Sequence, residues 1–231
     1  MTDDVVVKTE HLTKIYQEGK VGATALSDLS IELRRGEFAA LSGPSGSGKT
    51  TLLNLIGALD EPTEGRVVLD GLDLAELSRT ELSRLRRDRI GFVFQAYNLV
   101  PVLTAFENAE FVLALQGVEK EERRQRTMKV LEEVGIADLA DRRPDELSGG
   151  QQQRVAIARA IAPEPVIILA DEPTANVDSA NAAGLMDLME RLNREENMTF
   201  LFSTHDQRVI SRARRLISLQ DGELIGDEQV G

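Results

Sequence analysis

Eight residues in the first quarter of the chain have the types and spacing of a phosphate-binding loop. They match G-x-x-x-x-G-K-[ST] and read Gly43-Pro44-Ser45-Gly46-Ser47-Gly48-Lys49-Thr50. The glycines permit positive φ and close approach of backbone amides to phosphate. Lys49 would place its charge on the β- and γ-phosphates, and the Thr50 hydroxyl would ligate Mg²⁺. We therefore predict nucleotide binding here, and we include Thr51, the next residue, in the binding set.

Two adjacent acids end an apolar segment later in the chain. The segment Val166–Ala170 runs directly into Asp171 and Glu172. Neighbouring carboxylates repel each other unless a cation or polar ligand lies near. We expect Asp171 to hold the Mg²⁺ shell and Glu172 to polarise the attacking water. The alternative is a solvated acidic turn before Pro173. A GTPase would need Asn-Lys-x-Asp to read guanine, and no Asn in this chain is followed by Lys.

A second helix start has the properties of a phosphate site. The sequence Leu147-Ser148-Gly149-Gly150-Gln151 opens a helical segment. Free amides and the positive end of a helix dipole favour an anion there. One nucleotide does not need two such helix starts. A dimer explains why the chain has both, because the Ser148 segment of each copy would close the nucleotide site of the other. An ordinary serine N-cap is the alternative.

The composition narrows the possible functions. The 231 residues include 27 Lys and Arg against 39 Asp and Glu, and the resulting net charge of −12 disfavours a nucleic-acid partner. The chain has no cysteine, which excludes thiol catalysis, disulfides and cysteine-based zinc sites. No apolar run approaches the ~20 residues that span a bilayer, and the N-terminus is unlike a secretory signal. We expect a soluble chain that reaches a membrane only through a partner.

Strand-like and helix-like segments that would position these residues alternate along the chain. The expected strands are Val5–Val7, Ser30–Leu33, Phe38–Ser42, Arg66–Leu69, Ile90–Phe94, Val166–Ala170, Thr199–Ser203 and Leu216–Leu219. Ser78 and Thr104, each followed three residues later by Glu, predict capping boxes. Further helices are expected over Lys120–Val134, over Gln151–Ala162 and around Leu185–Leu192. This is an α/β chain interrupted by a helical block near residues 97–158.

With these motifs in this order, the chain resembles the nucleotide-binding subunit of an ATP-binding-cassette (ABC) transporter from Leu12 to about Gly222. The resemblance implies a P-loop NTPase fold with a RecA-like core, a small antiparallel β subdomain and an inserted helical subdomain. One ABC ATPase domain would then fill residues 1–231. The core and β subdomain would take about 1–96 and 159–231, and the helical subdomain about 97–158.

The resemblance also implies roles for single residues. Tyr16 would stack on adenine, Gln95 would touch Mg²⁺ and sense the membrane partner, and His205 would act as a switch at the γ-phosphate. Each has a plainer alternative: a strand-edge aromatic, a polar strand terminator and a helix cap. The segment Ala175–Asp178 would cross the dimer interface, although Ala175 and Val177 stand where Gly and Leu are commoner. The predicted catalytic set is Lys49, Gln95, Glu172 and His205, and the predicted metal set is Thr50, Gln95 and Asp171.

Finer similarity points to the lipoprotein-release and macrolide-export branch, through the segments Leu53–Asp60 and Gly91–Pro101. It implies Mg²⁺-dependent ATP hydrolysis by two copies that sandwich ATP head to tail. They would drive an integral membrane permease for export or lipoprotein extraction, as a peripheral subunit on the cytoplasmic face of the inner membrane. A mechanical signaller in cell-wall control is the alternative. An ABC ATPase acting on DNA or ribosomes fits less well, because the chain holds one cassette and has no room for coiled-coil insertions.

One predicted helix is too apolar for a small subdomain to bury. Phe111, Val112, Leu113, Ala114 and Leu115 are consecutive, and residues ~100° apart cover the whole helix circumference. We expect a groove formed with the segment Tyr97–Pro101 that receives a short cytoplasmic helix of the membrane partner. Full burial of this helix is the alternative. Four arginines lie nearby in the sequence: Arg84, Arg86, Arg87 and Arg89. They would contact the membrane partner or anionic lipid, and the alternative is a solvated basic face.

Overall fold

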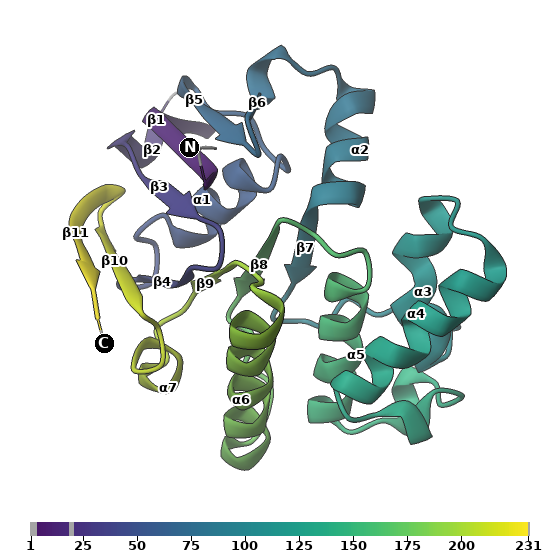
Figure 1. Cartoon of the computed structure of the whole chain (residues 1–231). Helices are drawn as coiled ribbons and strands as arrows, with labels where there is room; N and C mark the ends of the chain where they lie inside the picture. The colour runs from purple at the N-terminus through teal and green to yellow at the C-terminus, as the bar shows by residue number, and fades with distance from the viewer. Residues whose placement is uncertain (1–3, 19–20, 231) are drawn as a thin grey trace.

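The computed structural model describes residues 4–18 and 21–230, and the strands within them form two sheets (Figure 1). The larger sheet has six strands in the order β11-β10-β4-β9-β8-β7. Its members are β4 (Phe38–Ser42), β7 (Ile90–Val93), β8 (Ile167–Asp171), β9 (Phe200–Ser203), β10 (Arg215–Gln220) and β11 (Glu223–Gln229). All neighbouring pairs are parallel except β10 with β11. The carboxyl ends of five adjacent strands, β10, β4, β9, β8 and β7, therefore meet at one edge, where ligands bind in open α/β sheets.

The smaller sheet is antiparallel. It contains β1 (Val5–Glu18), β2 (Val21–Leu29), β3 (Glu32–Arg34), β5 (Glu64–Leu69) and β6 (Leu72–Asp73), with β1 pairing to β2, β3 and β5. The sequence did not predict β2, because Gly, Ala and Ser weaken its strand propensity, and pairing with β1 overrides that weakness. The sequence also did not predict β11, which contains Gly226 and acidic residues. The strand β1 is far longer than the predicted Val5–Val7.

The helices agree with the expected ones, except that the short helix over Gln207–Ile210 was not predicted. They are α1 (Lys49–Ile56), α2 (Arg79–Arg89), α3 (Ala105–Leu115), α4 (Lys120–Glu133), α5 (Gly149–Ile161), α6 (Ser179–Glu196) and α7 (Gln207–Ile210), with short 3₁₀ turns at Leu74–Glu76, Ala137–Leu139 and Pro144–Glu146. The capping boxes predicted at Ser78 and Thr104 are confirmed, since each side chain accepts from the N3 amide and the N3 glutamate accepts in return.

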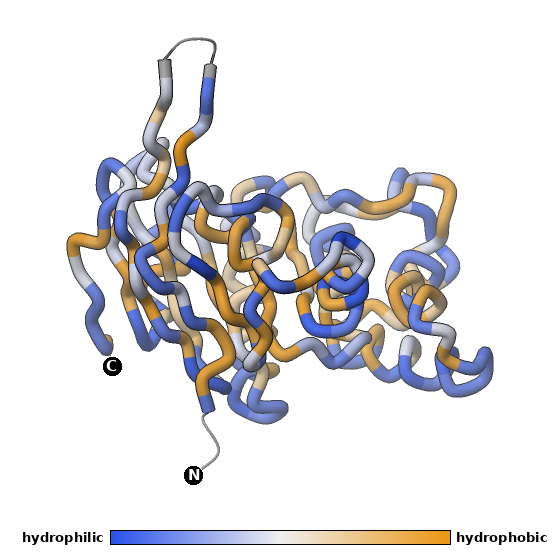
Figure 2. The backbone as a smooth tube through the Cα atoms, turned by 90° about the horizontal axis from the view of Figure 1, so that it is seen from above, coloured by the Kyte–Doolittle hydropathy of each residue, from blue (hydrophilic) through white to orange (hydrophobic). Residues whose placement is uncertain are grey.

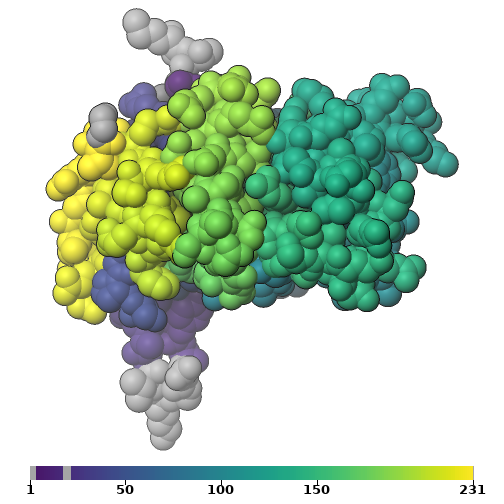
Figure 3. Space-filling model, turned by 90° about the horizontal axis from the view of Figure 1, so that it is seen from below, coloured from purple at the N-terminus to yellow at the C-terminus, as the bar shows by residue number. Residues whose placement is uncertain are grey.

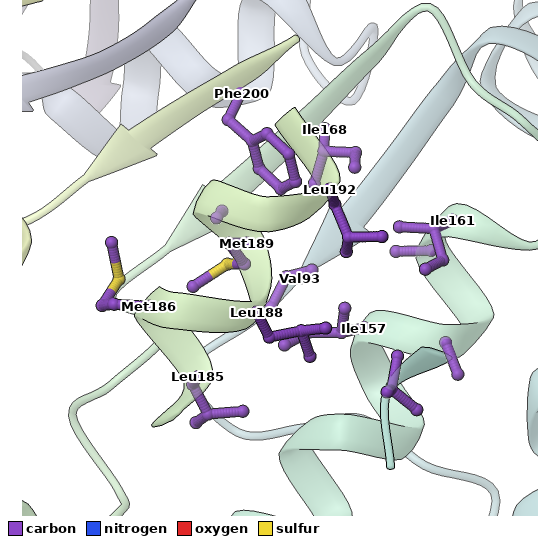
Figure 4. Packing of buried hydrophobic residues seen from close by; sticks show 14 of the residues in the cluster. Val93, Ile157, Ile161, Ile168, Leu185, Met186, Leu188, Met189, Leu192 and Phe200 are labelled. Atoms are coloured by element: carbon purple, nitrogen blue, oxygen red, sulfur yellow. The ribbon is translucent and has the colours of Figure 1, made fainter. Parts of the chain in front are cut away.

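The parallel sheet separates two hydrophobic cores. Along β4, Phe38 and Ala40 point into one core, whereas Ala39 and Leu41 point into the other, as the twofold repeat of a strand requires. The first core packs α5 and α6 against the sheet, and Figure 4 shows Ile157 and Ile161 of α5 facing the α6 residues Leu188 and Leu192. The second core joins α1 and the antiparallel sheet to the other face. Both faces are thus covered, which accounts for the continuous apolar runs of β8 and β9.

The helices α3 and α4 lie at one end of the molecule, away from the antiparallel sheet (Figures 1 and 2). Figure 3 shows α6 between this helical part and the C-terminal strands. The helices α3 and α4 lie between residues 97 and 158, and the division of the chain into a core and a helical subdomain stays a prediction. Among the described residues, no helix is both long enough and apolar enough to cross a membrane.

Candidate active site

The phosphate loop connects the end of β4 to the start of α1. Gly48 is the N-cap of α1 at φ 98°, and a Cβ there would lie 2.5 Å from the carbonyl oxygen of Ala25. At Gly43, where φ is 149°, a Cβ would lie 2.1 Å from the Leu219 carbonyl oxygen. Both positions therefore require glycine. Because the cap has no side chain, the first amides of α1 stay available to an anion at the positive end of the helix dipole.

Lys49 lies across this loop. Its Nζ donates to the carbonyl oxygens of Gly43 at 2.8 Å and Pro44 at 2.9 Å, and the residue is buried. A buried ammonium must be hydrogen-bonded, and these two carbonyls satisfy that need within the loop. The arrangement holds a positive charge at the loop that would surround phosphate groups.

Thr50 and Asp171 lie next to each other at the end of the phosphate loop. The Thr50 hydroxyl, in the first turn of α1, donates to the Asp171 carboxylate at 3.2 Å and 3.3 Å, and Asp171 ends β8. Within residues 4–18 and 21–230, no group of three or more His, Asp or Glu side chains gathers as a metal site. Oxygen donors beside a phosphate loop suit Mg²⁺, which binds through few protein ligands plus phosphates and water.

Glu172 is fixed by the turn that follows β9. Its Oε1 lies 2.5 Å from His205 Nδ1 and accepts from the His205 amide at 3.2 Å, while its Oε2 accepts from the Thr204 hydroxyl at 3.1 Å. The glutamate has φ 47°, in the left-handed region that side chains rarely adopt. These contacts hold the carboxylate in the cleft against that strain. The sequence did not single out Thr204, whose signal is its position beside His205.

The turn that carries His205 is itself anchored. Hydrogen bonds from Arg208 hold the pKa of the Asp206 carboxyl at about 2, and Asp206 also accepts from the Thr174 hydroxyl at 3.1 Å. Asp206 therefore stays ionised at neutral pH and ties the loop after Glu172 to the turn after β9. This connection positions Glu172 and His205 as one unit.

A second set of contacts fixes the loop after β7, which carries Gln95. The Asn176 side chain donates to the Gln95 carbonyl oxygen at 2.8 Å, and the Tyr97 hydroxyl donates to the Asn176 carbonyl oxygen at 2.8 Å. Arg159 donates to the carbonyl oxygens of Tyr97 and Asn98, and burial lowers the pKa of its guanidinium. Sequence reasoning missed Tyr97, Asn176 and Arg159 as loop supports, because these contacts join distant parts of the chain.

The strand-end residues come together in one cleft of about 620 Å³. They arrive from four adjacent parallel strands: the phosphate loop from β4, the acids from β8, His205 from β9 and Gln95 from β7. The predicted residues that line the cleft are Pro44, Ser45, Gly46, Gly48, Lys49, Thr50, Thr51, Gln95, Asp171, Glu172 and His205. This arrangement can bind a triphosphate and place a carboxylate beside it.

Two groups of predicted residues lie apart from this cleft, and Gly43 and the buried Ser47 of the phosphate loop do not line it. Tyr16, on β1, is 39% exposed and donates its hydroxyl to Asp60. Ser148 is the N-cap of α5 and forms a capping box with Gln151, as the alternative of an ordinary serine N-cap predicts. Ser148 is also exposed, and it does not line the cleft of its own chain. Gly149 is packed so that a Cβ would lie 2.8 Å from the Tyr97 hydroxyl, which brings the Gln95 loop against the start of α5.

Comparison with known proteins places this geometry in a family. The ABC transporter family model matches residues 26–175. The ABC transporter ATP-binding protein MJ0796 of Methanocaldococcus jannaschii is 45% identical over 229 residues, covering 97% of this chain and 97% of that protein. Its structure, a dimer in a post-hydrolysis state bound to ADP and Pi, matches with a TM-score of 0.90, covering 97% of this chain and 99% of the solved one.

Two further relatives belong to transport systems. The lipoprotein-releasing system ATP-binding protein LolD 1 of Chlorobium chlorochromatii is 43% identical over 229 residues, which cover 98% of this chain and 93% of that protein. The macrolide export ATP-binding/permease protein MacB of Brucella melitensis is 43% identical over 222 residues, covering 96% of this chain and 34% of that protein. The match to MacB therefore spans about a third of a longer protein.

Proposed function

The chain belongs to the ABC transporter family as an ATP-binding protein, and we propose that it hydrolyses ATP to power a membrane permease. In this proposal two copies close around ATP, and the permease uses closure and opening for export or for extraction of a lipoprotein or other substrate. The chain would sit at the cytoplasmic face of the membrane and reach it only through that permease. The observation that carries the proposal is the convergence of Lys49, Glu172 and His205 on the cleft that the phosphate loop forms.

Binding would use the phosphate loop as an anion site. The amides at the start of α1 would donate to the β- and γ-phosphates, and the Lys49 ammonium would turn from the Gly43 and Pro44 carbonyls toward them. Each such charge-assisted hydrogen bond to an oxyanion is stronger than the neutral contact it replaces. The loop is therefore preorganised for phosphate before the nucleotide arrives.

The residues present fit Mg²⁺. The Thr50 hydroxyl and the Asp171 carboxylate are 3.2 Å apart at the end of the phosphate loop, and Gln95 lines the same cleft. These three would hold the ion through oxygen atoms. When bound, Mg²⁺ supplies charge neutralisation for the phosphate oxygens.

Glu172 would act as the general base. Its carboxylate accepts the proton of the attacking water as the new oxygen–phosphorus bond forms and the bond to the ADP oxygen breaks. His205 holds the same carboxylate through Nδ1, so its other ring nitrogen is directed elsewhere and would meet the γ-phosphate. A hydrogen bond to Thr204 keeps the second carboxylate oxygen in place.

The Ser148 segment would complete the site of a second copy. Ser148 is exposed and lies outside the cleft of its own chain, yet it presents the free amides of an α5 N-terminus. Two copies arranged head to tail would each place that helix end on the other's γ-phosphate. Because this contact exists only while the γ-phosphate is present, hydrolysis removes it and the dimer opens. The relative MJ0796 is a dimer in a post-hydrolysis state bound to ADP and Pi, which supports pairing of two copies.

Lys49→Ala tests the binding step. The change removes the buried ammonium while the loop backbone stays, so we expect ATP affinity to fall about 10- to 100-fold, the equivalent of one charged hydrogen bond. Fluorescence titration with a labelled ATP analogue measures the loss. Lys129→Ala is the matched control, because Lys129 is exposed on α4 and pairs with Glu133. Equal affinity of the Lys49→Ala protein and the unaltered chain would contradict the proposed site.

The partner groove is the surface that would receive the permease. It has a volume of about 380 Å³ and is lined by apolar residues, most of them from α3 and β7, together with three arginines: Leu59, Arg86, Arg87, Ile90, Gly91, Phe92, Phe94, Asn98, Phe111, Val112, Leu115, Arg159, Ala160 and Pro163. As expected from its sequence, α3 is not fully buried, because Phe111 is 40% and Leu115 57% exposed. Unburied apolar side chains in a groove favour an apolar partner helix.

The details of this groove differ from the expectation. From the segment Tyr97–Pro101, Asn98 lines it. The Tyr97 hydroxyl instead donates to the Asn176 carbonyl oxygen, and the backbone at Tyr97 is left-handed, with φ 55°. Three of the four predicted arginines are bonded within the chain: Arg86 to the Ala58 carbonyl oxygen, Arg87 to Asp88 and Arg89 to Asp70. Arg84 is exposed. The groove still adjoins the Gln95 loop, which coupling between the permease and the ATP site requires.

Single cysteines test the groove directly, because the chain has none of its own. In membranes that contain the permease, Asn98→Cys and Leu115→Cys should crosslink to it through a short bifunctional reagent. Ile225→Cys is the matched control, since Ile225 is a 61% exposed apolar residue on β11. If Ile225→Cys crosslinks to the permease and the two groove positions do not, the permease binds at the C-terminal strands and not at the partner groove, which contradicts the proposal.

A further inference from the structure

Tyr16 is held by two contacts, one at its hydroxyl and one at its ring face. Its hydroxyl donates to Asp60 Oδ2 at 2.8 Å, and the Lys14 ammonium lies 4.9 Å from the ring centroid. Lys14 covers one ring face by a cation–π contact, which leaves the opposite face for a stacking partner. A side chain 39% exposed is thereby fixed in a single orientation.

Asp60 joins the two side chains that fix this orientation. Its Oδ1 accepts from Lys14 Nζ at 2.7 Å, and its Oδ2 accepts from Tyr16. The Lys14 side chain is 12% exposed and also donates to the Glu61 carbonyl oxygen. Burial by itself raises the pKa of the Asp60 carboxyl, but the hydrogen bonds from Lys14 and Tyr16 outweigh burial and hold this pKa below its ordinary value. Asp60 is therefore ionised when it holds both neighbours.

The turn that carries Asp60 is rigidly attached to α1. The Leu59 amide donates to the Asn54 carbonyl oxygen at 2.8 Å, and Arg86 donates to the Ala58 carbonyl oxygen at 2.7 Å. The Asp60 carboxylate also accepts from the next amide, that of Glu61, at 2.8 Å. Since α1 begins at the phosphate loop, Asp60 fixes the Tyr16 ring relative to the same helix that would hold the phosphates.

We propose that Asp60 is a positioning residue for the adenine base: it presets the Tyr16 ring, with Lys14 behind it, at a fixed place relative to the phosphate loop. This inference rests on the proposed function, ATP binding and hydrolysis, and on the stacking of Tyr16 on adenine that the family resemblance implies. A preset ring costs less entropy on binding than one that must be ordered by the nucleotide. The effect concerns the base alone, because Asp60 touches no residue of the phosphate cradle directly.

The test compares two ligands of the full-length chain, ATP and inorganic triphosphate, by isothermal titration. Tyr16→Ala should raise the Kd for ATP about 10-fold, within the range of aromatic–base stacking. Asp60→Ala and Tyr16→Phe should each raise it about threefold to fivefold, because the ring remains and its orientation is lost. The Kd for triphosphate should stay within about twofold in all three, which also shows that the variants fold. Asp28→Ala is the matched control, because its carboxylate pairs with His11 at the surface of the same sheet.

The outcomes separate the inference from the proposal beneath it. If Tyr16→Ala does not weaken ATP binding selectively over triphosphate binding, Tyr16 does not stack on adenine and the inference about Asp60 falls with it, whereas the proposed ATP hydrolysis does not depend on that result. If Tyr16→Ala is selective but Asp60→Ala and Tyr16→Phe bind ATP like the unaltered chain, stacking stands and the role of Asp60 is overturned. Equal losses for ATP and triphosphate in Asp60→Ala would make Asp60 a structural residue and also overturn the inference.

Discussion

Glu172→Gln should lower the turnover number for ATP by about a thousandfold, the usual contribution of a positioned general base, while ATP affinity stays near that of the unaltered chain. Glutamine keeps the shape of the side chain and can still accept the hydrogen bond from Thr204, but it cannot take a proton from water. The phosphate loop, Lys49 and Thr50 are unchanged, so binding survives. Phosphate release under saturating Mg-ATP measures turnover, and titration with a labelled ATP analogue measures affinity.

A second glutamate supplies the control. Glu164, like Glu172, has a positive φ, 55°, and precedes a proline, but it lies outside the cleft and pairs with Arg126. Glu164→Gln should therefore hydrolyse ATP at the rate of the unaltered chain. If Glu172→Gln and Glu164→Gln hydrolyse ATP at the same rate, Glu172 is not the general base.

Ser148→Arg should lower turnover about a hundredfold or more with little change in ATP affinity of the single chain, since lost oxyanion donors cost this much. Ser148 is exposed, so arginine fits the isolated fold. In the closed pair, however, its bulk would occupy the place of the partner's γ-phosphate. Turnover measured against protein concentration reports the loss.

Loss of the helix cap alone must be distinguished from loss of the shared site. Ser78 is the matched control, because it is also exposed and also forms a capping box, with Glu81 at the start of α2. Both substitutions remove a cap worth about 1 kcal/mol. Ser78→Arg should retain turnover. If Ser78→Arg and Ser148→Arg impair turnover equally, the Ser148 segment acts through helix stability and not on a second nucleotide.

Much of the cleft was predictable from the sequence because its residues come from motifs fixed at strand ends. The phosphate loop, Asp171 and His205 each follow an apolar strand, and parallel pairing of β4, β9 and β8 brings those ends together. The family resemblance and the P-loop fold read from these motifs are confirmed by the relatives and by the solved structure of MJ0796. The roles of the single residues stay predictions.

Contacts between distant loops could not be predicted in this way. The Tyr97 hydroxyl meets Asn176, 79 residues away, only because β7 pairs with β8. The same contact removes the Tyr97 ring from the groove where the sequence placed it. Likewise, five consecutive apolar residues indicated unburied sides on α3 but not which ones: Leu113 is fully buried, whereas Leu115 is exposed. Tertiary packing decides such outcomes, and helical periodicity alone does not contain them.

The central claim is that ATP joins two copies of this chain through the Ser148 segment. Sedimentation velocity of Glu172→Gln tests it most directly, because this variant should bind ATP without consuming it. Without nucleotide the protein should sediment as a monomer, since a net charge of −12 on each copy opposes association. With Mg-ATP it should sediment as a dimer, and the added change Ser148→Arg should return it to the monomer. A monomer at saturating Mg-ATP, or a dimer that forms without ATP and persists with Ser148→Arg, would contradict the account.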